Sequence, residues 1–375
     1  MRAPIAPGLP VVVKVGSSSL TGADGIDPAA IEGVVDQVTG VWQAGRAVVL
    51  VTSGAVAAGL PALGLRRRPT DLVGLQVAAA VGQSRLMERY TADLSRRGIV
   101  AGQVLLTRAV LSDRDQYLNA RGALWRMLEQ RIVPIVNEND TVAVEELRLG
   151  DNDRLAALVS HLVSAGLLVL LTDTDGLLSS DPRIDVEAEL LSAVRHNDEV
   201  LDRLASGGVG PYGSGGIATK VAAARMAAWS GIPTVVASSG NDRAVAQAIA
   251  GEEVGTWVAP RSRRLPARKL WIAFGLRTTG RVWIDRGAVG ALVDHGRSLL
   301  PVGVTSVEGP FVSGSAVEVH GPDGAVVAKG LTRMSSRELE AWLGRRLEGG
   351  GEIIHRDDMV VLSSPDGPIS GTLRG

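Results

Sequence analysis

The chain has 375 residues, of which 45% are hydrophobic and 21% are charged, and its formal net charge is −1. This length predicts two domains, and the composition is typical of a globular protein with a well-filled core. The near-neutral charge argues against a generally basic nucleic-acid-binding protein, although a local basic patch stays open. Because the chain has no cysteine, disulfides, thiolate nucleophiles and Cys–Zn sites are excluded, and its five histidines are scattered without metal-ligand spacing.

Two segments bear on the question of a membrane or an exported protein. The first ten residues carry three prolines and no long apolar run, so they do not resemble a signal peptide, and we expect a cytoplasmic protein. Residues 155–171 are almost wholly apolar and approach the length of a membrane span. Ser160, His161 and Gly166 interrupt this run, which favours a buried helix, a turn at Gly166 and a buried strand. No membrane association is therefore expected.

Lysine is scarce in this chain, since only Lys14, Lys220, Lys269 and Lys329 stand among its 39 Lys and Arg residues. Two of them lie in Gly/Ser-rich stretches, Val-Val-Val-Lys14-Val-Gly-Ser-Ser-Ser and Gly-Ser-Gly-Gly-Ile-Ala-Thr-Lys220. A compact ammonium suits a polyphosphate there, because glycine lets backbone N–H groups approach while lysine supplies a point charge. Either lysine alone is equally consistent with an ordinary surface residue, but together they favour a phosphoryl-transfer enzyme.

Over the first two-thirds of the chain, short Val/Leu/Ile runs alternate with longer Ala-rich amphipathic stretches. This pattern predicts an α/β fold with a mainly parallel sheet flanked by helices. The predicted strands lie near 11–15, 47–51, 99–106, 132–136, 167–171 and 234–237, and the predicted helices near 28–44, 71–96, 113–130, 151–165 and 219–230. Ligands of such sheets gather at the carboxyl ends of strands, where polar clusters begin at Gly16, Thr52, Asn137 and Thr172.

The pattern changes after residue 258. Residues 259–267 are rich in Pro and Arg and predict a linker between a catalytic domain over 1–258 and a second domain over 268–361. Short alternating runs broken by Gly and Pro predict that the second domain is small and β-rich, with a helix near 288–294. Residues 362–375, rich in Ser, Pro and Gly, predict a flexible tail.

The segment that ends at Lys220 can be compared with two known nucleotide-binding motifs, the Walker A loop and the dinucleotide fingerprint. It is not a Walker A loop, because it ends in Thr-Lys rather than Gly-Lys-Ser/Thr, and it matches a dinucleotide fingerprint only weakly. A Gly-rich turn leading into the amino end of a helix is a favourable place for an anion, although a plain surface loop stays open. Thr172-Asp173 begins like a calcium loop, but no glutamate follows at the required spacing, which favours contact with a nucleotide base or ribose.

Two other segments are dense in short polar side chains, Asn137-Glu-Asn-Asp140 and Gly150-Asp151-Asn-Asp153. One of Asp151 and Asp153 could simply cap a helix. Alternatively, these amides and carboxylates hold the amino and carboxyl groups of a small substrate while one Asp orients the lysines. Ser53 follows a strand and could contact the same ligand or be a plain turn serine. No histidine stands beside a candidate nucleophilic serine in a triad motif.

Taken in order, these motifs closely resemble the glutamate 5-kinases of the amino acid kinase family. The resemblance covers roughly residues 10–361, and the Asn-Glu-Asn-Asp and Gly-Asp-Asn-Asp pair separates it from the wider family. The other matching pieces are Val-Val-Lys14-Val-Gly-Ser-Ser, Val-Thr-Ser53-Gly-Ala, Ala-Ala-Val-Gly82-Gln-Ser-Arg, Leu-Leu-Thr107-Arg, Tyr-Leu-Asn119-Ala-Arg, Leu-Thr172-Asp173, Gly-Ser-Gly-Gly-Ile-Ala-Thr-Lys220 and His355-Arg-Asp-Asp-Met. The second domain resembles a PUA domain. PUA modules elsewhere bind RNA, which the neutral charge argues against here.

The resemblance implies that ATP, with Mg²⁺, phosphorylates the side-chain carboxylate of L-glutamate to L-glutamyl 5-phosphate in proline biosynthesis. It implies catalytic roles for Lys14, Lys220 and Asp153, and no residue is assigned to a metal. The implied substrate-binding residues are Ser53, Asn137, Asp140, Asp151 and Asn152. The implied ATP-binding residues are Lys14, Gly16, Thr172, Asp173, Ser214, Gly215, Gly216, Ile217, Ala218, Thr219 and Lys220. Ala218 departs from the Ser expected in some relatives. Inhibition by proline and a homo-oligomer are also implied.

Two alternatives stay open at the level of the sequence. Within the same fold, the chain could phosphorylate another small acid, such as acetylglutamate or aspartate. From a different class, it could be an RNA-binding or assembly protein whose kinase-like domain is inactive, although the retained lysines argue against inactivity. A carboxylate is already ionised at neutral pH, so a kinase of this kind needs no general base and works through alignment and charge.

Overall fold

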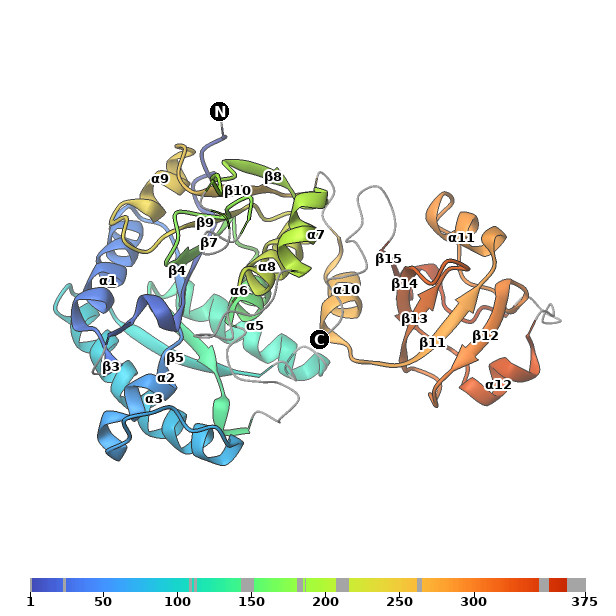
Figure 1. Ribbon diagram of the computed structural model, residues 1–375, viewed down its shortest axis with the longest axis horizontal. Helices are drawn as coiled ribbons and strands as arrows, with labels where there is room; N and C mark the ends of the chain where they lie inside the picture. The colour runs from blue at the N-terminus through green and yellow to red at the C-terminus, as the bar shows by residue number, and fades with distance from the viewer. Residues whose placement is uncertain are drawn as a thin grey trace. The chain divides into compact units, whose positions relative to one another are not determined.

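The computed structural model describes residues 2–22, 25–107, 110, 113–142, 152–180, 185, 187–206, 216–261, 265–343 and 351–362 (Figure 1). The chain divides into two compact units. One consists of Met1–Val110 with Asp115–Ser262, and the other of Leu111–Arg114 with Arg263–Gly375. Apart from Leu362, the predicted tail lies outside the described residues.

The described part of the first unit is built on an eight-stranded sheet in the order β5-β6-β4-β1-β7-β9-β10-β8. Neighbouring strands are parallel, with β9 and β10 as the antiparallel pair, so the predicted α/β fold with a mainly parallel sheet is confirmed. The strands are β1 (Val11–Val15), β4 (Val48–Val51), β5 (Ala101–Leu106), β6 (Val133–Glu138), β7 (Leu167–Thr172), β8 (Ala193–Arg195), β9 (Thr234–Ser238) and β10 (Thr256–Ala259). A separate short ribbon pairs β2 (Thr21–Gly22) with β3 (Gly25–Ile26).

The position of β1 in the sheet determines where a ligand can bind. From β1 the chain builds β4, β5 and β6 on one side and then returns to place β7 on the other side. In open parallel sheets, ligands bind outside the carboxyl ends of the strands where the order reverses in this way. The residues at the ends of β1, β4 and β7 are therefore the ones expected to face a ligand.

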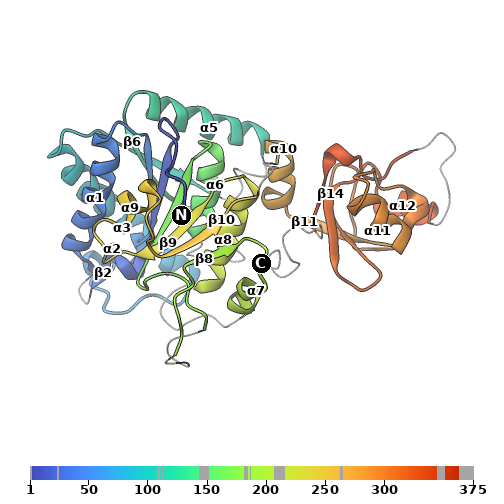
Figure 2. The ribbon, with the colours of Figure 1, turned by 90° about the horizontal axis from the view of Figure 1, so that it is seen from above.

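Helices cover both faces of this sheet (Figures 1 and 2). Helices α1, α3 and α9 pack over the apolar side chains that β1 directs to one face, and α6 and α8 lie against the other face. The helices are α1 (Pro28–Gln43), α2 (Ala55–Gly59), α3 (Leu72–Ser95), α5 (Arg114–Glu129), α6 (Asn152–Leu162), α7 (Glu199–Ser206), α8 (Ile217–Trp229) and α9 (Ala244–Ala250), with single turns η1 (Ser17–Ser19), η2 (Pro61–Leu63) and η3 (Asp140–Val142).

The apolar run over residues 155–171 is a buried helix followed by a buried strand, as predicted. Helix α6 ends at Leu162, and Ser164 adopts a left-handed conformation with φ of 51°. The Gly166 N–H donates to the carbonyl of Pro10 at 2.8 Å, which sets the following strand β7 beside β1. Within the described part of the chain, no helix is long and apolar enough to cross a membrane.

Helices α2 and α3 cross at two glycines. A Cβ atom at Gly82 would lie 1.8 Å from the carbonyl oxygen of Ala55, and one at Gly59 would lie 2.0 Å from that of Ala78. Real Cβ atoms do not approach so closely, so only glycine permits this crossing. The crossing joins α2, which follows the end of β4, to α3, whose Gln83 accepts a hydrogen bond from Asn137 in β6.

We expect Gly82→Ala to destabilise the first unit by about 1–3 kcal/mol, since backbone atoms would have to separate to admit the methyl group. Thermal unfolding of the purified chain measures the effect. Gly122→Ala is the matched control, because Gly122 lies exposed in α5 and a Cβ atom added there would have no neighbour within 4 Å. That control should be neutral or slightly stabilising. Equal unfolding temperatures for the two variants would contradict the close crossing.

The second unit contains a five-stranded sheet in the order β12-β11-β13-β14-β15 among its described residues. Strands β11 and β13 are parallel and the other neighbours are antiparallel, which confirms the predicted small β-rich domain. Its elements are α10 (Ala267–Leu270), the π-helical turn η4 (Trp271–Gly275), β11 (Thr278–Ile284), α11 (Arg286–Val293), η5 (Pro301–Gly303), β12 (Val304–Glu308), β13 (Ala316–His320), β14 (Val326–Leu331), α12 (Ser336–Ala341), η6 (Arg356–Asp358) and β15 (Met359–Val361).

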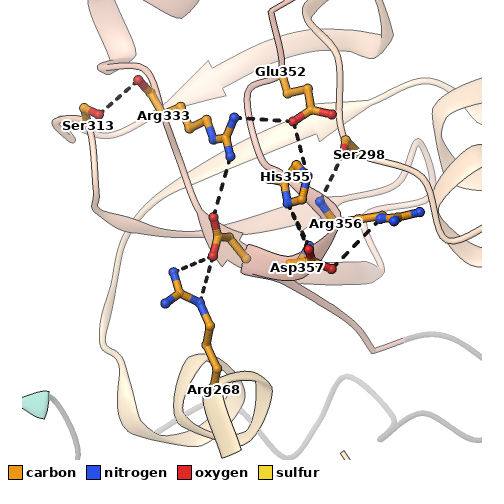
Figure 3. A network of polar contacts seen from close by, with 9 residues as sticks. Arg268, Ser298, Ser313, Arg333, Glu352, His355, Arg356 and Asp357 are labelled. Atoms are coloured by element: carbon orange, nitrogen blue, oxygen red, sulfur yellow. Dashed lines mark hydrogen bonds and ion pairs between the residues drawn. The ribbon is translucent and has the colours of Figure 1, made fainter. Parts of the chain in front are cut away.

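Polar contacts fasten the segment with the His355-Arg-Asp-Asp-Met motif to the rest of the second unit (Figure 3). The Arg268 side chain donates to Asp358 Oδ1 at 2.9 Å from Nε, and Arg333 Nη1 lies 3.5 Å from Glu352 Oε2. His355 Nδ1 accepts from the Asp357 backbone N–H at 3.2 Å and so caps η6. This motif therefore has a structural role within the second unit.

One of the four scarce lysines is also structural. Lys329 lies buried in β14, and its Nζ donates to the carbonyls of Ala273 at 3.1 Å and Leu276 at 2.5 Å. Burial lowers the pKa of Lys329 to about 8, although the nearby Glu318 carboxylate opposes the fall. The ammonium thereby ties the π-helical turn to the sheet.

Candidate functional site

A buried aspartate lies between two lysines at the carboxyl ends of the central strands. Lys14 Nζ, from β1, lies 2.6 Å from Asp153 Oδ1 at the start of α6. Lys220 Nζ, from the first turn of α8, lies 3.7 Å from Asp153 Oδ2. The Thr219 hydroxyl donates to the same Oδ2 at 2.7 Å. Three elements that are remote in the sequence therefore meet at one carboxylate.

The charges of the cluster formed by Lys14, Lys220 and Asp153 favour the binding of an anion. Burial alone would raise the pKa of Asp153, but Lys14, Lys220 and the hydrogen bonds from Lys14 and Thr219 outweigh it and hold the pKa below its usual value. Burial lowers the pKa of the Lys220 ammonium, and Lys14 adds to the fall, while Asp153 and Asp173 oppose it. Two ammonium groups beside one carboxylate carry a net positive charge in a poorly solvated place, where attraction to a phosphate is strong.

A cluster of amide side chains lies beside the charged cluster. Asn152 Nδ2 shares its two hydrogens among Thr52 O at 2.7 Å, Ser53 Oγ at 2.8 Å and Asn137 Oδ1 at 2.8 Å. Asn137 Nδ2 in turn donates to Gln83 Oε1 at 2.7 Å. The ends of β4 and β6, the start of α6 and the middle of α3 are joined in this way. Asn152 is the sequence neighbour of Asp153, so the two clusters are adjacent.

Asp140 lies half-buried at the start of η3, just beyond β6. Burial raises the pKa of its carboxyl to about 6, although the nearby Arg68 opposes the shift. A carboxyl with a pKa near neutrality changes charge with small changes of environment, and a cationic ligand group would hold it ionised. Asp151, the remaining predicted substrate contact, lies outside the described residues.

The predicted nucleotide residues lie on the side of β7 and α8. Thr172, buried at the end of β7, donates from its hydroxyl to Oδ1 of the exposed Asp173 at 3.0 Å. Gly216 is the N-cap residue of α8 and has no side chain to cap the first turn, in which Ile217 and Ala218 stand. Ser214 and Gly215 lie outside the described residues.

Gly16 follows the end of β1 and lies close to the ammonium of Lys14. A Cβ atom there would be 3.4 Å from Lys14 Nζ. Any other residue at this position would place its Cβ atom against the buried ammonium of Lys14.

Gln83 is the residue of this cluster that the sequence motifs alone did not assign to the site. It stands within the motif Ala-Ala-Val-Gly82-Gln-Ser-Arg, so a signal is present in the resemblance. No periodicity, however, could show that an α3 side chain reaches Asn137. The contact depends on where α3 crosses the sheet.

The second unit has a hollow of its own. An open cavity of about 820 Å³ is lined by residues of β11, β12 and β13, among them Trp283, whose ring lies 4.9 Å from that of His320. The charged groups of its wall pair with one another: Arg281 contacts Glu308 at 2.8 Å, and His320 Nε2 lies 3.1 Å from Glu318 Oε2. The lining holds one arginine and two carboxylates, so it lacks the net positive charge that marks the cluster around Asp153.

Comparison with known proteins agrees with this division of the chain. Residues 10–238 match the amino acid kinase family, and residues 280–348 match the PUA domain. The chain is 49% identical to the glutamate 5-kinase of Frankia casuarinae, over 94% of this chain and 96% of that protein. It is 47% identical to the glutamate 5-kinase of Thermobifida fusca, over 96% and 95%, and 47% identical to that of Stutzerimonas stutzeri, over 94% and 97%. The chain belongs to the glutamate 5-kinases of the amino acid kinase family.

Membership of the glutamate 5-kinases confirms the resemblance drawn from the motifs and identifies the second unit as a PUA domain. The geometry brings Lys14, Lys220 and Asp153 into contact and gathers Ser53, Asn137 and Asn152 beside them. Their assignment to ATP or to the acceptor remains a prediction.

Proposed function

We propose that this chain transfers the γ-phosphoryl group of ATP to the side-chain carboxylate of L-glutamate, which makes L-glutamyl 5-phosphate for proline biosynthesis. The observation that carries the proposal is the pair of lysines held on one buried carboxylate, next to a cluster of amides. The first group suits a phosphoryl group in transit, and the second suits the polar ends of an amino acid. The names of the relatives agree with this reaction.

Catalysis in such a site consists of alignment and stabilisation of charge. The acceptor carboxylate is already ionised, with an ordinary pKa of about 4.3, so no general base is needed. Lys14 and Lys220 neutralise the oxygens of the moving phosphoryl group, and Asp153 with Thr219 fixes the position of both ammonium groups. Fixed charges are effective because they need no reorganisation as the reaction proceeds.

ATP is proposed to bind along the ends of β7 and α8. The amino end of α8, which has no side-chain cap at Gly216, suits phosphate oxygens, because the first N–H groups of a helix point at such a ligand. Asp173 is exposed beyond β7, where it can meet the ribose or base. The described residues hold no group of three or more His, Asp or Glu side chains suited to a metal. Mg²⁺ is proposed to arrive as part of the substrate, on the ATP phosphates.

L-glutamate is proposed to bind against Ser53, Asn137, Asn152 and Asp140. An Asp140 carboxylate placed toward the substrate ammonium would attract it, and the amides supply both donors and acceptors for a zwitterion. Acetylglutamate lacks that ammonium, and aspartate is shorter by one methylene group. Both alternatives would leave part of this polar set unpaired, which favours L-glutamate.

The experiment that tests the proposal measures ADP formation from Mg-ATP with a panel of acids: L-glutamate, N-acetyl-L-glutamate and L-aspartate. We expect kcat/KM for L-glutamate to exceed that for either other acid by at least about 100-fold, because unpaired buried polar groups discriminate strongly. A preference for another acid would replace the substrate assignment. No ADP from any acid would support a non-catalytic assembly or RNA-binding protein.

The Asp140 assignment predicts a particular pH dependence. Below its pKa of about 6 the carboxyl becomes neutral and loses its attraction for the substrate ammonium. We expect kcat/KM for L-glutamate to fall about 10-fold from pH 7 to pH 5, since this parameter reports groups of the free enzyme. The matched variant Asp140→Asn should have a lower kcat/KM at pH 7 and a flat profile over this range. An unchanged slope in Asp140→Asn would exclude the residue from substrate binding.

A cytoplasmic location, a homo-oligomer and inhibition by proline are further expectations of the resemblance. The PUA domain is proposed to have a regulatory or interaction role rather than a role in the transfer step. The lining of its cavity includes the carboxylates of Glu308 and Glu318, which do not favour an RNA phosphate backbone as ligand there.

A further inference from the structure

The orientation of the amide cluster is determined by two backbone groups. The backbone N–H of Glu138 can only donate, and it donates to Asn137 Oδ1 at 2.9 Å. Asn137 Nδ2 must therefore face the other way, toward Gln83. Asn152 Nδ2 donates to the carbonyl of Thr52 at 2.7 Å, which can only accept. These hydrogen bonds therefore determine which amide atom is oxygen and which is nitrogen in Asn137, Asn152 and Gln83.

In this orientation, two polar atoms of the amide cluster have no hydrogen-bond partner among the described residues. These atoms are Asn152 Oδ1 and Gln83 Nε2, and both are buried. One is an acceptor and the other a donor. A buried polar atom without a partner is costly, and a bound ligand or an ordered water removes that cost. An α-amino acid offers the complement, an ammonium that donates and a carboxylate that accepts.

We infer that Gln83 is a positioning residue for the amino-acid substrate. Its Oε1 satisfies Asn137 Nδ2, which keeps Asn137 Oδ1 on Asn152 Nδ2 and so keeps Asn152 Oδ1 turned to accept from the substrate ammonium. Its own Nε2 is left to donate to the α-carboxylate. Gln83 thus acts on specificity for an α-amino acid over a plain dicarboxylic acid. This inference rests on the proposed function, since it concerns the acceptor of the same reaction.

The crossing of α2 and α3 at Gly59 and Gly82 explains how the side chain of Gln83 reaches Asn137. Gly82 precedes it and allows α3 to lie against α2, which in turn follows Ser53 at the end of β4. The backbone that presents Ser53 and the side chain of Gln83 are thereby held at a fixed separation. Small shifts of α3 would break the 2.7 Å contact to Asn137.

Two acids separate positioning from general damage: L-glutamate and pentanedioate, which has both carboxylates but no ammonium. The measured quantity is the ratio of their kcat/KM values with Mg-ATP. Gln83→Leu removes the acceptor for Asn137 Nδ2, and we expect the ratio to fall about 10- to 100-fold, mainly through a higher KM for L-glutamate. Gln83→Glu keeps an oxygen facing Asn137 but loses the N–H donor. It should raise KM for both acids and keep the ratio at or above that of the wild type.

Ser84→Ala, at an exposed neighbouring position of α3, is the control for disturbance of the helix. It should match the wild type in both parameters, and the thermal unfolding of each variant reports folding. A wild-type ratio in correctly folded Gln83→Leu would overturn the inference, as would an equal fall of the ratio in Gln83→Glu. If the wild type phosphorylates neither acid, the proposed function itself fails, which is a distinguishable result.

Discussion

Replacement of Asp153 by asparagine is expected to lower kcat by about 10²–10³-fold, although the two side chains have almost the same shape. The carboxylate is fully buried and lies 2.6 Å from Lys14 Nζ and 3.7 Å from Lys220 Nζ. Without its charge the two ammonium groups repel each other, and an amide N–H would face either a lysine or the Thr219 hydroxyl. The lysines would then no longer be held where the moving phosphoryl group needs them.

Initial rates with saturating Mg-ATP and L-glutamate measure this prediction for Asp153→Asn. The fall should appear chiefly in kcat, because the aspartate is proposed to act on the transition state through the lysines. Asp202→Asn is a matched control, since Asp202 also pairs with a buried cation, Arg225, at 2.8 Å. That pair joins α7 to α8 and has no proposed place in the reaction. Equal loss of kcat in the two variants would show that Asp153 has only a structural role.

The second large effect is expected from the lysines themselves. Lys14→Met and Lys220→Met keep the length of the side chain and remove its charge, and each should lower kcat by about 10²–10³-fold. Loss of Lys220 should also raise KM for ATP, because Lys220 stands in the first turn of the helix proposed to meet the phosphates. Lys269→Met, at a lysine of the second unit, is the control and should leave both parameters unchanged.

Turnover near that of the wild type in either Lys14→Met or Lys220→Met would remove that lysine from the proposed mechanism. The double variant gives a further check. If both ammonium groups act on the same phosphoryl oxygens through one carboxylate, the combined loss should be smaller than the product of the single losses.

The regular elements of the first unit can be predicted because their apolar runs are long and their periodicity is clear. The predicted bounds of β1 are the observed ones, since every residue of Val11–Val15 is buried and the run ends in a polar loop. β8 and β10 are absent from the predicted strands because each has only three or four residues, too few for a clear apolar run; β8 is the edge strand and β10 lies next to it. The short helices α2 and α9 give no periodic signal.

The candidate site also has a part that could be predicted from the sequence and a part that could not. Lys14 and Lys220 could be placed at a ligand-binding edge from the local sequence, because each lies where a strand or turn meets small residues. Their meeting on Asp153 could not, since Lys14 and Asp153 are 139 residues apart and only the packing of α6 against β1 joins them. The role of Gln83 could not be predicted for the same reason. Its partner is determined by the crossing of α3, which depends on Gly82.

The central claim is that the glutamate side-chain carboxylate itself attacks the γ-phosphorus of ATP. L-glutamate labelled with oxygen-18 in that carboxylate tests it directly, with hydroxylamine present to cleave the acyl phosphate at its carbonyl carbon. Cleavage leaves the bridging oxygen on phosphate, so each phosphate released should carry one oxygen-18 atom and one hydroxamate should form with it. Phosphate without label and no hydroxamate would mean that water accepts the phosphoryl group, which would contradict the proposed reaction.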